Sequence, residues 1–432
     1  MKKYEKYRDS GIEWLGEVPE HWKIRRIKDI FYLQRGRFSH RPRNDQRMYE
    51  NGIYPFIQTG DVSKSNKYII SYEQTLNQNG IKVSKLFKKD TLVMTIAANI
   101  GDVAMIAFDS YFPDSLVAFN TKYNKDFYFY LLQTTKEELN TVKVTNTQDN
   151  LNLERLNSLH KLLPPISEQI LIGNYLDTKT QLIDKKIELL NKKINLFKEL
   201  RKSLINKAVC RGLDDSVKLK DSGIDWIGKI PEHWKVKRVK DVFETLAGGT
   251  PSTKNEKYWE GIIPWIPSGK VQNNYITSDT VEDYISKEAL IDSSTKLAKR
   301  DSILIALTGA TCSNVGYLKF DTTINQSIVA ISSKKNDLII EYYFYFLLSA
   351  REKLRTMMTG GAQGGINQED IRFFKIILPP ISEQGFILSF VKDKIKNIVI
   401  IQNNLQQQIA KLQELRKTLI NDVVTGKIKV TE

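Results

Sequence analysis

Leu163-Pro-Pro-Ile-Ser-Glu-Gln169 occurs a second time in this sequence as Leu378-Pro-Pro-Ile-Ser-Glu-Gln384. Each copy opens a long helical run, and the two runs close on Glu199-Leu-Arg-Lys-Ser-Leu-Ile-Asn206 and Glu414-Leu-Arg-Lys-Thr-Leu-Ile-Asn421. The openings are 215 positions apart and so are the closings, so the two runs have the same length. A connecting loop can drift in length, whereas an element that sets a distance cannot. The repeat therefore predicts two equal rods, each following a globular block.

The ends of both runs carry residues typical of helix termini. Pro165 and Pro380 suit the start of a helix, and a glutamate follows each of them in the first turn, where the helix dipole favours a carboxylate. Gly212 and Gly426 are typical of the point where a helix stops. About 40 residues at 1.5 Å each predict a rod of roughly 60 Å.

Both runs also carry an apolar stripe whose members alternate in steps of four and three, which is the spacing of a coiled-coil seam. Because a lone helix with one apolar stripe is marginal in water, we expect the two helices to pack against each other as an antiparallel coiled coil. The alternatives are that each helix packs on its own domain or on another protein. The predicted seam consists of Ile183, Ile187, Leu190, Ile194, Phe197 and Leu204 in the first run and Ile398, Gln402, Leu405, Ile409, Leu412 and Leu419 in the second.

Polar residues interrupt this seam at a few positions. Arg201 and Arg416 occupy matching places in the two runs. Gln402 stands where the first run has Ile187, and there the two copies differ in polarity. A glutamine in a seam either sets the register of the helix pair or is exposed to solvent.

The composition limits the classes of protein to which this chain can belong. With 432 residues and 41% hydrophobic content, the chain is expected to form more than one domain with substantial cores. The formal net charge of +15 fits a polyanionic partner, although a basic chain can also be merely soluble. Two distant cysteines give no disulfide framework and predict a reducing compartment. Neither a signal peptide nor a membrane span is evident, so the expected location is cytoplasmic.

The repeat extends beyond the two rods. Asp9-Ser-Gly-Ile-Glu-Trp-Leu-Gly-Glu-Val-Pro-Glu-His-Trp22 recurs as Asp221-Ser-Gly-Ile-Asp-Trp-Ile-Gly-Lys-Ile-Pro-Glu-His-Trp234, at an offset of 212. The second globular block is therefore three residues longer than the first, and two such units indicate a duplication with pseudo-twofold symmetry. The predicted order is a leading segment 1–31, a first block 32–161, a central spacer helix 162–212, a linker with the second leading segment 213–243, a second block 244–376 and a C-terminal spacer helix 377–432.

Each block is expected to be a small mixed domain. The apolar runs Thr91–Ile96 and Ser302–Leu307 are typical of buried strands, and each is followed by a turn and another strand. Asp126-Phe-Tyr-Phe-Tyr-Leu-Leu132 and Glu341-Tyr-Tyr-Phe-Tyr-Phe-Leu-Leu348 are typical of matching helices. The predicted fold class is α+β, with two mixed domains and two long helices. One frame with different surface residues suggests the same task performed on two targets.

A search for catalytic motifs predicts no active site. There is no phosphate-binding Gly-x-x-x-x-Gly-Lys loop and no Gly-x-Gly-x-x-Gly after a strand. The four histidines and two cysteines lack the spacing of metal ligands, and His21 and His233 hold the same place in the leading segments, which favours a structural role. The Asn/Asp-Pro-Pro-Tyr/Phe motif of adenine methyltransferases is also absent. We therefore expect no catalytic residue, metal site or cofactor in this chain.

Polar and basic loops remain as candidates for binding DNA. Arginine can donate two hydrogen bonds at once to a phosphate or to the edge of a guanine, and asparagine or glutamine can pair with adenine. The alternative for the basic loop is a solvated surface, and the polar loops 145–150 and 360–367 either approach a DNA backbone or are connectors. The candidates are Arg35, Arg37, His40, Arg41, Arg43 and Arg47 in the first block and Thr250, Ser252, Lys254 and Lys270 in the second.

Taken together, the paired helix starts, the paired helix ends and the paired Gly-Ile-x-Trp-x-Gly-x-x-Pro-Glu-His-Trp segments resemble the specificity subunits (HsdS) of type I restriction–modification systems. Gly248-Gly-Thr-Pro-Ser252 with Ile263-Pro-Trp-Ile266 also looks typical of the recognition domains of that family. The resemblance covers nearly all 432 residues.

This resemblance implies two target-recognition domains joined by two spacer helices, each domain recognising one half of a split double-stranded DNA site. It also implies a chain that is not itself catalytic. The expected partners are two methyltransferase subunits, which use S-adenosylmethionine, and restriction subunits, which use ATP and Mg²⁺. Two other functions stay open: a single-chain restriction–methylation enzyme, and a coiled-coil scaffold without sequence-specific DNA binding.

Overall fold

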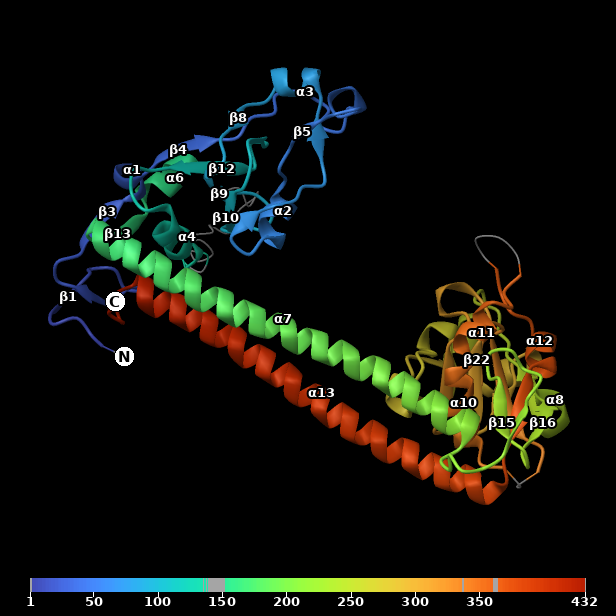
Figure 1. Ribbon diagram of the computed structural model, residues 1–432. Helices are drawn as coiled ribbons and strands as arrows, with labels where there is room; N and C mark the ends of the chain where they lie inside the picture. The colour runs from blue at the N-terminus through green and yellow to red at the C-terminus, as the bar shows by residue number, and fades with distance from the viewer. Residues whose placement is uncertain are drawn as a thin grey trace. The chain divides into compact units, whose positions relative to one another are not determined.

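The computed structural model describes residues 2–134, 136, 138, 152–335, 338–359 and 364–431. It consists of two compact units, which are unit 1 (Met1–Leu190 with Gln406–Glu432) and unit 2 (Asn191–Leu405). Each unit contains one of the two blocks (domain 1, residues 32–161, and domain 2, residues 244–376) together with half of each long helix (Figure 1).

A five-stranded sheet forms the centre of domain 1. Its middle strands β9 and β10 are buried along their whole length, because both are continuous apolar runs that pack on both faces. All strand pairs are antiparallel except β10 with β6, and α4 (Lys125–Gln133) packs against β10. The strand order is β4 (Tyr32–Arg35), β12 (Leu116–Asn120), β9 (Leu92–Thr95), β10 (Val103–Ile106) and β6 (Tyr68–Ile69).

Domain 2 contains the same sheet with the same connections. Its helix α10 (Ile340–Ser349) packs on β22 and β23 as α4 packs on β10. The buried strands and matching helices expected from the sequence are therefore confirmed in both domains. The strand order is β17 (Phe243–Ala247), β25 (Ile328–Ser333), β22 (Ile303–Ala306), β23 (Val315–Leu318) and β19 (Tyr275–Ile276).

Short elements complete each domain, and they differ more than the sheets do. Domain 1 also contains η1 (Gln46–Met48), β5 (Tyr54–Pro55), α2 (Thr59–Lys64), β7 (Thr75–Leu76), α3 (Gln78–Lys82), β8 (Leu86–Phe87), β11 (Ser110–Tyr111) and α6 (Leu153–Ser158). Domain 2 also contains η2 (Glu256–Trp259), β18 (Ile263–Ile266), η3 (Ser268–Lys270), η4 (Ser278–Thr280), β20 (Asp283–Ile285), α9 (Lys287–Asp292), β21 (Leu297–Ala298), η5 (Gly309–Thr311), β24 (Thr322–Ile324), α11 (Arg351–Arg355) and α12 (Gln368–Phe373).

The two leading segments fold alike. The first forms β1 (Tyr7–Asp9), β2 (Glu17–Pro19), β3 (Lys23–Arg26) and α1 (Ile27–Ile30), and the second forms β14 (Leu219–Asp221), β15 (Lys229–Pro231), β16 (Lys235–Arg238) and α8 (Val239–Val242). Strand β3 pairs with β13 (His160–Leu163), and β16 pairs with β26 (Lys375–Leu378). These pairs connect the start of each domain to the residues just before each long helix, a contact that the sequence did not predict.

The long helices are α7 (Ile166–Arg211, 46 residues) and α13 (Ile381–Val424, 44 residues). Helix α7 begins directly after Pro165 and ends directly before Gly212, whose φ of +79° suits glycine. In unit 1 the Arg416 Nε lies 3.0 Å from the Asp184 Oδ1, and in unit 2 the Gln402 Nε2 lies 3.4 Å from the Ile194 carbonyl oxygen. Later residues of α13 thus contact earlier residues of α7, so the helices pair antiparallel, and the predicted fold class is confirmed.

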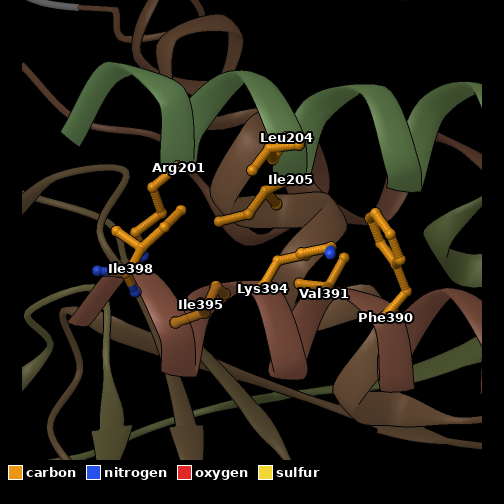
Figure 2. Close-up of a pocket in the computed structure, with 8 residues that line it drawn as sticks. All are labelled: Arg201, Leu204, Ile205, Phe390, Val391, Lys394, Ile395 and Ile398. Carbon is orange, nitrogen blue, oxygen red and sulfur yellow. The ribbon is translucent and has the colours of Figure 1, made fainter. Parts of the chain in front are cut away.

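Every residue of the predicted seam is at least partly turned away from solvent. Ile194, Ile398, Leu405 and Ile409 are buried, and the remaining predicted positions, Gln402 included, are half-buried. Within unit 2, Figure 2 shows Leu204 and Ile205 of α7 facing Val391 and Ile395 of α13, with Arg201 reaching across beside Ile398. Leucines on other faces of the same helices, at positions 182, 189, 196 and 415, are more than 50% exposed.

Candidate nucleic-acid interface

The first turn of each long helix is attached to the leading segment by one glutamate. Glu168 Oε1 lies 2.6 Å from His21 Nε2, and Glu168 Oε2 accepts hydrogen bonds from Trp22 Nε1 (3.0 Å) and the Tyr4 hydroxyl (2.8 Å). Burial alone would raise the pKa of Glu168, but the hydrogen bonds from His21, Trp22 and Tyr4 outweigh it and lower the pKa. The glutamate is therefore held as a carboxylate at the positive end of the helix.

The second copy repeats this contact. Glu383 Oε1 lies 2.6 Å from His233 Nε2, and Glu383 Oε2 accepts a hydrogen bond of 2.9 Å from Trp234 Nε1. Both tryptophans are buried. The two repeated histidines therefore hold a helix start, which agrees with the structural role inferred from the sequence.

The next residue, a glutamine, attaches each domain to its helix. Gln169 accepts a hydrogen bond from the backbone N–H of Asn124 (3.1 Å), just before α4, and donates to the Pro164 carbonyl (2.8 Å). Gln384 does the same with the N–H of Ile339 (2.9 Å), just before α10, and with the carbonyl of the proline at 379 (2.9 Å). Both glutamines are buried. The repeated Glu-Gln pair thus fixes how each domain sits on the helix start, a role that the sequence analysis missed although the motif itself was visible.

The candidate loops leave the two sheets at the same point. Gly36 follows β4 and donates its N–H to the Leu116 carbonyl, and Gly248 follows β17 and donates to the Ile328 carbonyl. A Cβ at either glycine would lie 2.1 Å from a backbone carbonyl oxygen, so no other residue fits. Beyond these glycines the sequences of the two domains differ, with an arginine-rich loop in domain 1 and a polar loop in domain 2.

In domain 1, two aspartates lie among the predicted arginines. Arg43 Nη2 lies 2.5 Å from Asp114 Oδ1, and Arg41 Nη2 lies 3.9 Å from Asp114 Oδ2. Arg35 Nε donates to the Asp114 carbonyl at 2.6 Å. The guanidinium of Arg37 is exposed and has no partner among the described residues. The arginine side chains of the ion pairs remain about half exposed, so they can still turn to an incoming anion.

Asp45 orders the far end of this loop. Arg47 Nε and Nη2 contact the Asp45 carboxylate at 3.0 and 2.6 Å, and His40 Nε2 contacts it at 2.7 Å. The hydrogen bonds from Arg47 and then from His40 lower the pKa of Asp45 well below its usual range. Phe38 is buried in a small core with Phe56 at the base of the loop. The loop is therefore a packed structure with an excess of positive charge, and aspartates placed this way could not have been foreseen from spacing.

In domain 2 the predicted residues lie in a less charged surface. The Thr250 hydroxyl donates to the Gln326 side chain, and the Ser252 carbonyl accepts from Trp259 Nε1 at 3.3 Å. Lys254 is exposed and has no partner among the described residues, whereas Lys270 pairs with the Glu282 carboxylate. Three of the four predicted residues follow Gly248 closely, and Lys270 lies after β18.

The two other polar loops lie wholly or partly outside the described residues. The loop 145–150 is outside them, and of the loop 360–367 only residues 364–367 are described. There Gly365 pairs with Thr308 and Thr359, and Ile366 N–H donates to the Leu307 carbonyl at 2.8 Å. This part of the second loop therefore packs on the end of strand β22.

A basic cleft of about 700 Å³ lies in unit 2 between α7 and domain 2. Lys198, Arg201 and Lys202 line it from α7, and Arg351 lines it from α11. Glu352 is the acidic residue among its lining residues. The cleft therefore places positive charge beside domain 2, whose loop after Gly248 is weakly charged.

Among the described residues, two observations bear on metal binding and on thiol reactivity. In that part of the chain, no group of three or more His, Cys, Asp or Glu side chains could hold a metal ion. Burial raises the pKa of the Cys210 thiol to about 12, far from the range of a reactive thiolate. Among the described helices, none has both the length and the apolarity to cross a membrane.

The sequence pattern of one protein family matches both halves of the chain. The family is described as the type I restriction modification DNA specificity domain, and it matches residues 19–198 and 231–411. The chain belongs to this family. Each match begins within a leading segment and ends within a long helix, so the family domain includes the Glu-Gln contact described above.

One curated relative and two solved structures match nearly the whole length of this chain. It is 27% identical over 430 residues to the putative type I restriction enzyme MjaX specificity subunit of Methanocaldococcus jannaschii, covering 96% of each chain. A chain solved in a study of complex assembly and conformational transition of the type I R-M system has a TM-score of 0.74 at 15% identity, covering 95% of this chain and 99% of that chain. The HsdS subunit of Thermoanaerobacter tengcongensis has a TM-score of 0.54 at 15% identity, covering 95% and 98%. The structural likenesses show a common fold.

Proposed function

We propose that this chain is the non-catalytic DNA-specificity subunit of a type I restriction–modification complex. In this proposal each domain recognises one half of a split double-stranded DNA site, and the two spacer helices set the length of the unread gap. The observation that carries the proposal is the repeated frame, in which one sheet and one helix contact occur twice while the loops after Gly36 and Gly248 differ.

The candidate contacts suit two different kinds of recognition. The loop of domain 1 offers Arg37, Arg41, Arg43 and Arg47, whose guanidinium groups can make bidentate hydrogen bonds to phosphates or guanine edges. The loop of domain 2 offers hydroxyl groups and Lys254, which suit hydrogen bonds to base edges and a phosphate contact. Two half-sites read on one face of DNA lie about 34–36 Å apart, or one helical turn. Helices of more than 40 residues are long enough to serve such a spacing.

The chemistry would belong to partner subunits. Two methyltransferase subunits would use S-adenosylmethionine and flip the target adenine out of the duplex next to the domain that located it. Restriction subunits would use ATP and Mg²⁺. The exposed flanks of α7 and α13 would provide the docking surface for the methyltransferases, since leucines 182, 189, 196 and 415 are exposed there.

The test is to express the chain with its methyltransferase in a host and to map N6-methyladenine across the host genome. The expected result is one split motif with a constant gap. Replacing residues 32–161 by the corresponding block of a relative should change one half of the motif only. A change in both halves would contradict the model of two independent recognition domains.

Two controls separate the other functions. Methyltransferase activity from the purified chain alone would indicate a single-chain enzyme instead. A gel-shift titration of the assembled methylase without preference for any DNA sequence would indicate a scaffold. Lengthening both helices by one turn should change the gap and leave both half-sites unchanged.

A further inference from the structure

A second contact joins each domain to its long helix, and it differs between the copies. In unit 1 the ammonium of Lys67 lies 2.5 Å from Asp126 Oδ1 and 2.6 and 2.7 Å from the two carboxylate oxygens of Asp177. Lys67 precedes β6, Asp126 lies in α4 and Asp177 lies in α7. The Tyr130 hydroxyl donates to Asp177 Oδ1 at 2.7 Å. A cation of domain 1 therefore contacts an acid of the helix.

In unit 2 the charges at this contact are reversed. The carboxylate of Glu341, in α10, lies 3.1 and 3.2 Å from the ammonium of Lys392 in α13. The Tyr275 hydroxyl donates to Glu341 Oε1 at 2.7 Å, and Lys319 lies 3.9 Å from the same oxygen. An acid of domain 2 therefore contacts a cation of the helix.

The two contacts occupy equivalent places in the repeat. Asp177 and Lys392 are 215 positions apart, like the helix starts, and so are Asp126 and Glu341. Lys67 corresponds to Asn274, because the Met105 N–H donates to the Lys67 carbonyl at 2.8 Å and the equivalent Tyr317 N–H donates to the Asn274 carbonyl at 3.1 Å. The helix residue thus changes sign between the copies. It is contacted from a different domain position in each copy, by Lys67 in unit 1 and by Glu341 in unit 2.

The charged side chains that the domains contribute to these contacts are largely buried, so the difference between the copies affects stability. The side chains of Lys67 and Glu341 are only 14% and 13% exposed. An ion pair on the open surface contributes little to stability, whereas a largely buried charge that loses its partner or meets a like charge is costly. The Gln169 and Gln384 contacts are the same in both copies and cannot distinguish one domain from the other.

We propose that these two contacts match each recognition domain to its own spacer helix. Domain 1 placed on a helix with lysine at position 392 would bring Lys67 against a like charge. Domain 2 placed on a helix with aspartate at position 177 would bring Glu341 against a like charge. Asp126 and Lys319 would still partner one charge in each case, so the wrong combination is weakened rather than abolished. Asp177 and Lys392 are thus positioning residues that favour one domain over the other in each half of the chain.

The first test uses the stability of the whole chain and needs no DNA. Asp177→Lys should lower the Tm of unit 1 by several degrees, roughly 5 °C, because it places a second lysine beside Lys67. Adding Lys67→Asn should restore at least half of this loss, because the lysine introduced at 177 then pairs with Asp126 as Lys392 pairs with Glu341. The matched control in the same unit is Glu73→Lys, which breaks the exposed Lys64–Glu73 pair and should shift the Tm by less than about 1 °C.

Two results of this test would overturn the proposal. One is a shift for Asp177→Lys no larger than that of the control. The other is a double variant that stays as unstable as Asp177→Lys alone, because a merely structural aspartate would give no rescue by a change on the facing domain. Should Asp177→Lys fail to fold, Asp177→Asn, Lys67→Asn and the double variant form a double-mutant cycle. The Tm loss of the double variant should then be smaller than the sum of the two single losses, and additive losses would overturn the proposal.

The second test exchanges the domains and rests on the proposed function. A chain with residues 244–376 in place of 32–161 would carry domain 2 twice, once against Asp177. Expressed with the methyltransferase, this chimera should methylate its symmetric site several-fold more when it also carries Asp177→Lys. Equal methylation with either residue would overturn the matching of domain to helix. Absence of any split motif for the unaltered chain would instead overturn the proposed function and leave the stability test standing.

Discussion

Unit 1 and unit 2 share the sheet and the contacts at the helix start, and they differ in two other places. The order of the five-stranded sheet, the buried tryptophan, the glutamate at the helix start and the glutamine beside it are the same in both. The loops after Gly36 and Gly248 differ in charge, and the contacts at Asp177 and Lys392 differ in sign. The comparison teaches that the packing of the sheet and of the helix start constrains both copies alike, whereas the loops and the ion pair can differ without changing that packing.

The largest effect is expected from the tryptophans at the helix starts. Trp22→Ala and Trp234→Ala should each cost about 3–5 kcal/mol, because both indoles are fully buried and donate to a helix-start glutamate. If the units are equivalent frames, each variant should destabilise its own unit by a similar amount. Urea unfolding followed by hydrogen exchange, which resolves the two units, measures this. Very unequal losses would show that the two helix starts are not equivalent.

The glycines that precede the divergent loops come next. Gly36→Ala and Gly248→Ala should each cost about 1–3 kcal/mol or more, because the added methyl group meets a carbonyl oxygen at 2.1 Å. Gly60→Ala and Gly269→Ala are matched controls in the same domains, since an added Cβ there meets nothing within 4 Å. Thermal unfolding of the four variants should separate the two pairs. A neutral Gly248→Ala would mean that the second loop does not need this close approach.

A smaller effect is expected where the seam differs between the copies. Gln402→Ile should stabilise unit 2 by about 1 kcal/mol, because it replaces a long hydrogen bond of 3.4 Å to Ile194 by apolar packing. The reverse change in the other copy, Ile187→Gln, should destabilise unit 1 by a similar amount. Chemical unfolding of the two variants provides the measurement. If Gln402→Ile instead yields mixed oligomers in light scattering, the glutamine sets the register of the pair.

The smallest expected effect is on the pH dependence of the unfolding free energy. Because the pKa of Glu168 is lower in the folded chain than in the unfolded chain, its contribution is complete above the unfolded pKa of about 4.5 and is lost as the pH falls through the folded value. Unfolding free energy measured between about pH 6 and pH 3 should therefore fall less steeply for Glu168→Gln than for the unaltered chain. Parallel curves would show that the contact with His21 and Trp22 contributes no pH dependence.

Much of this architecture could be predicted from the sequence, because it follows from periodicity. The steps of four and three from Ile183 to Leu204 predicted the long helix α7 and one apolar face of it, and the apolar runs near residues 92–95 and 303–306 predicted the central strands. Contacts between distant residues could not be predicted in this way. Nothing in the spacing showed that Asp114 would lie beside Arg43 or that Lys67 would reach Asp177, since these depend on how separate elements pack. The same limit applies to the pairing of β3 with β13.

The pairing of β3 with β13 has a consequence for how the spacer helix can change length. The strand ends two residues before α7 begins, so the rotation of the helix about its axis is set at its first turn by the sheet. Each inserted residue turns everything beyond it by about 100°. Seven inserted residues return the seam almost to its original face, whereas one or two would turn it into solvent. The spacer is therefore expected to lengthen by whole helical turns rather than by single residues.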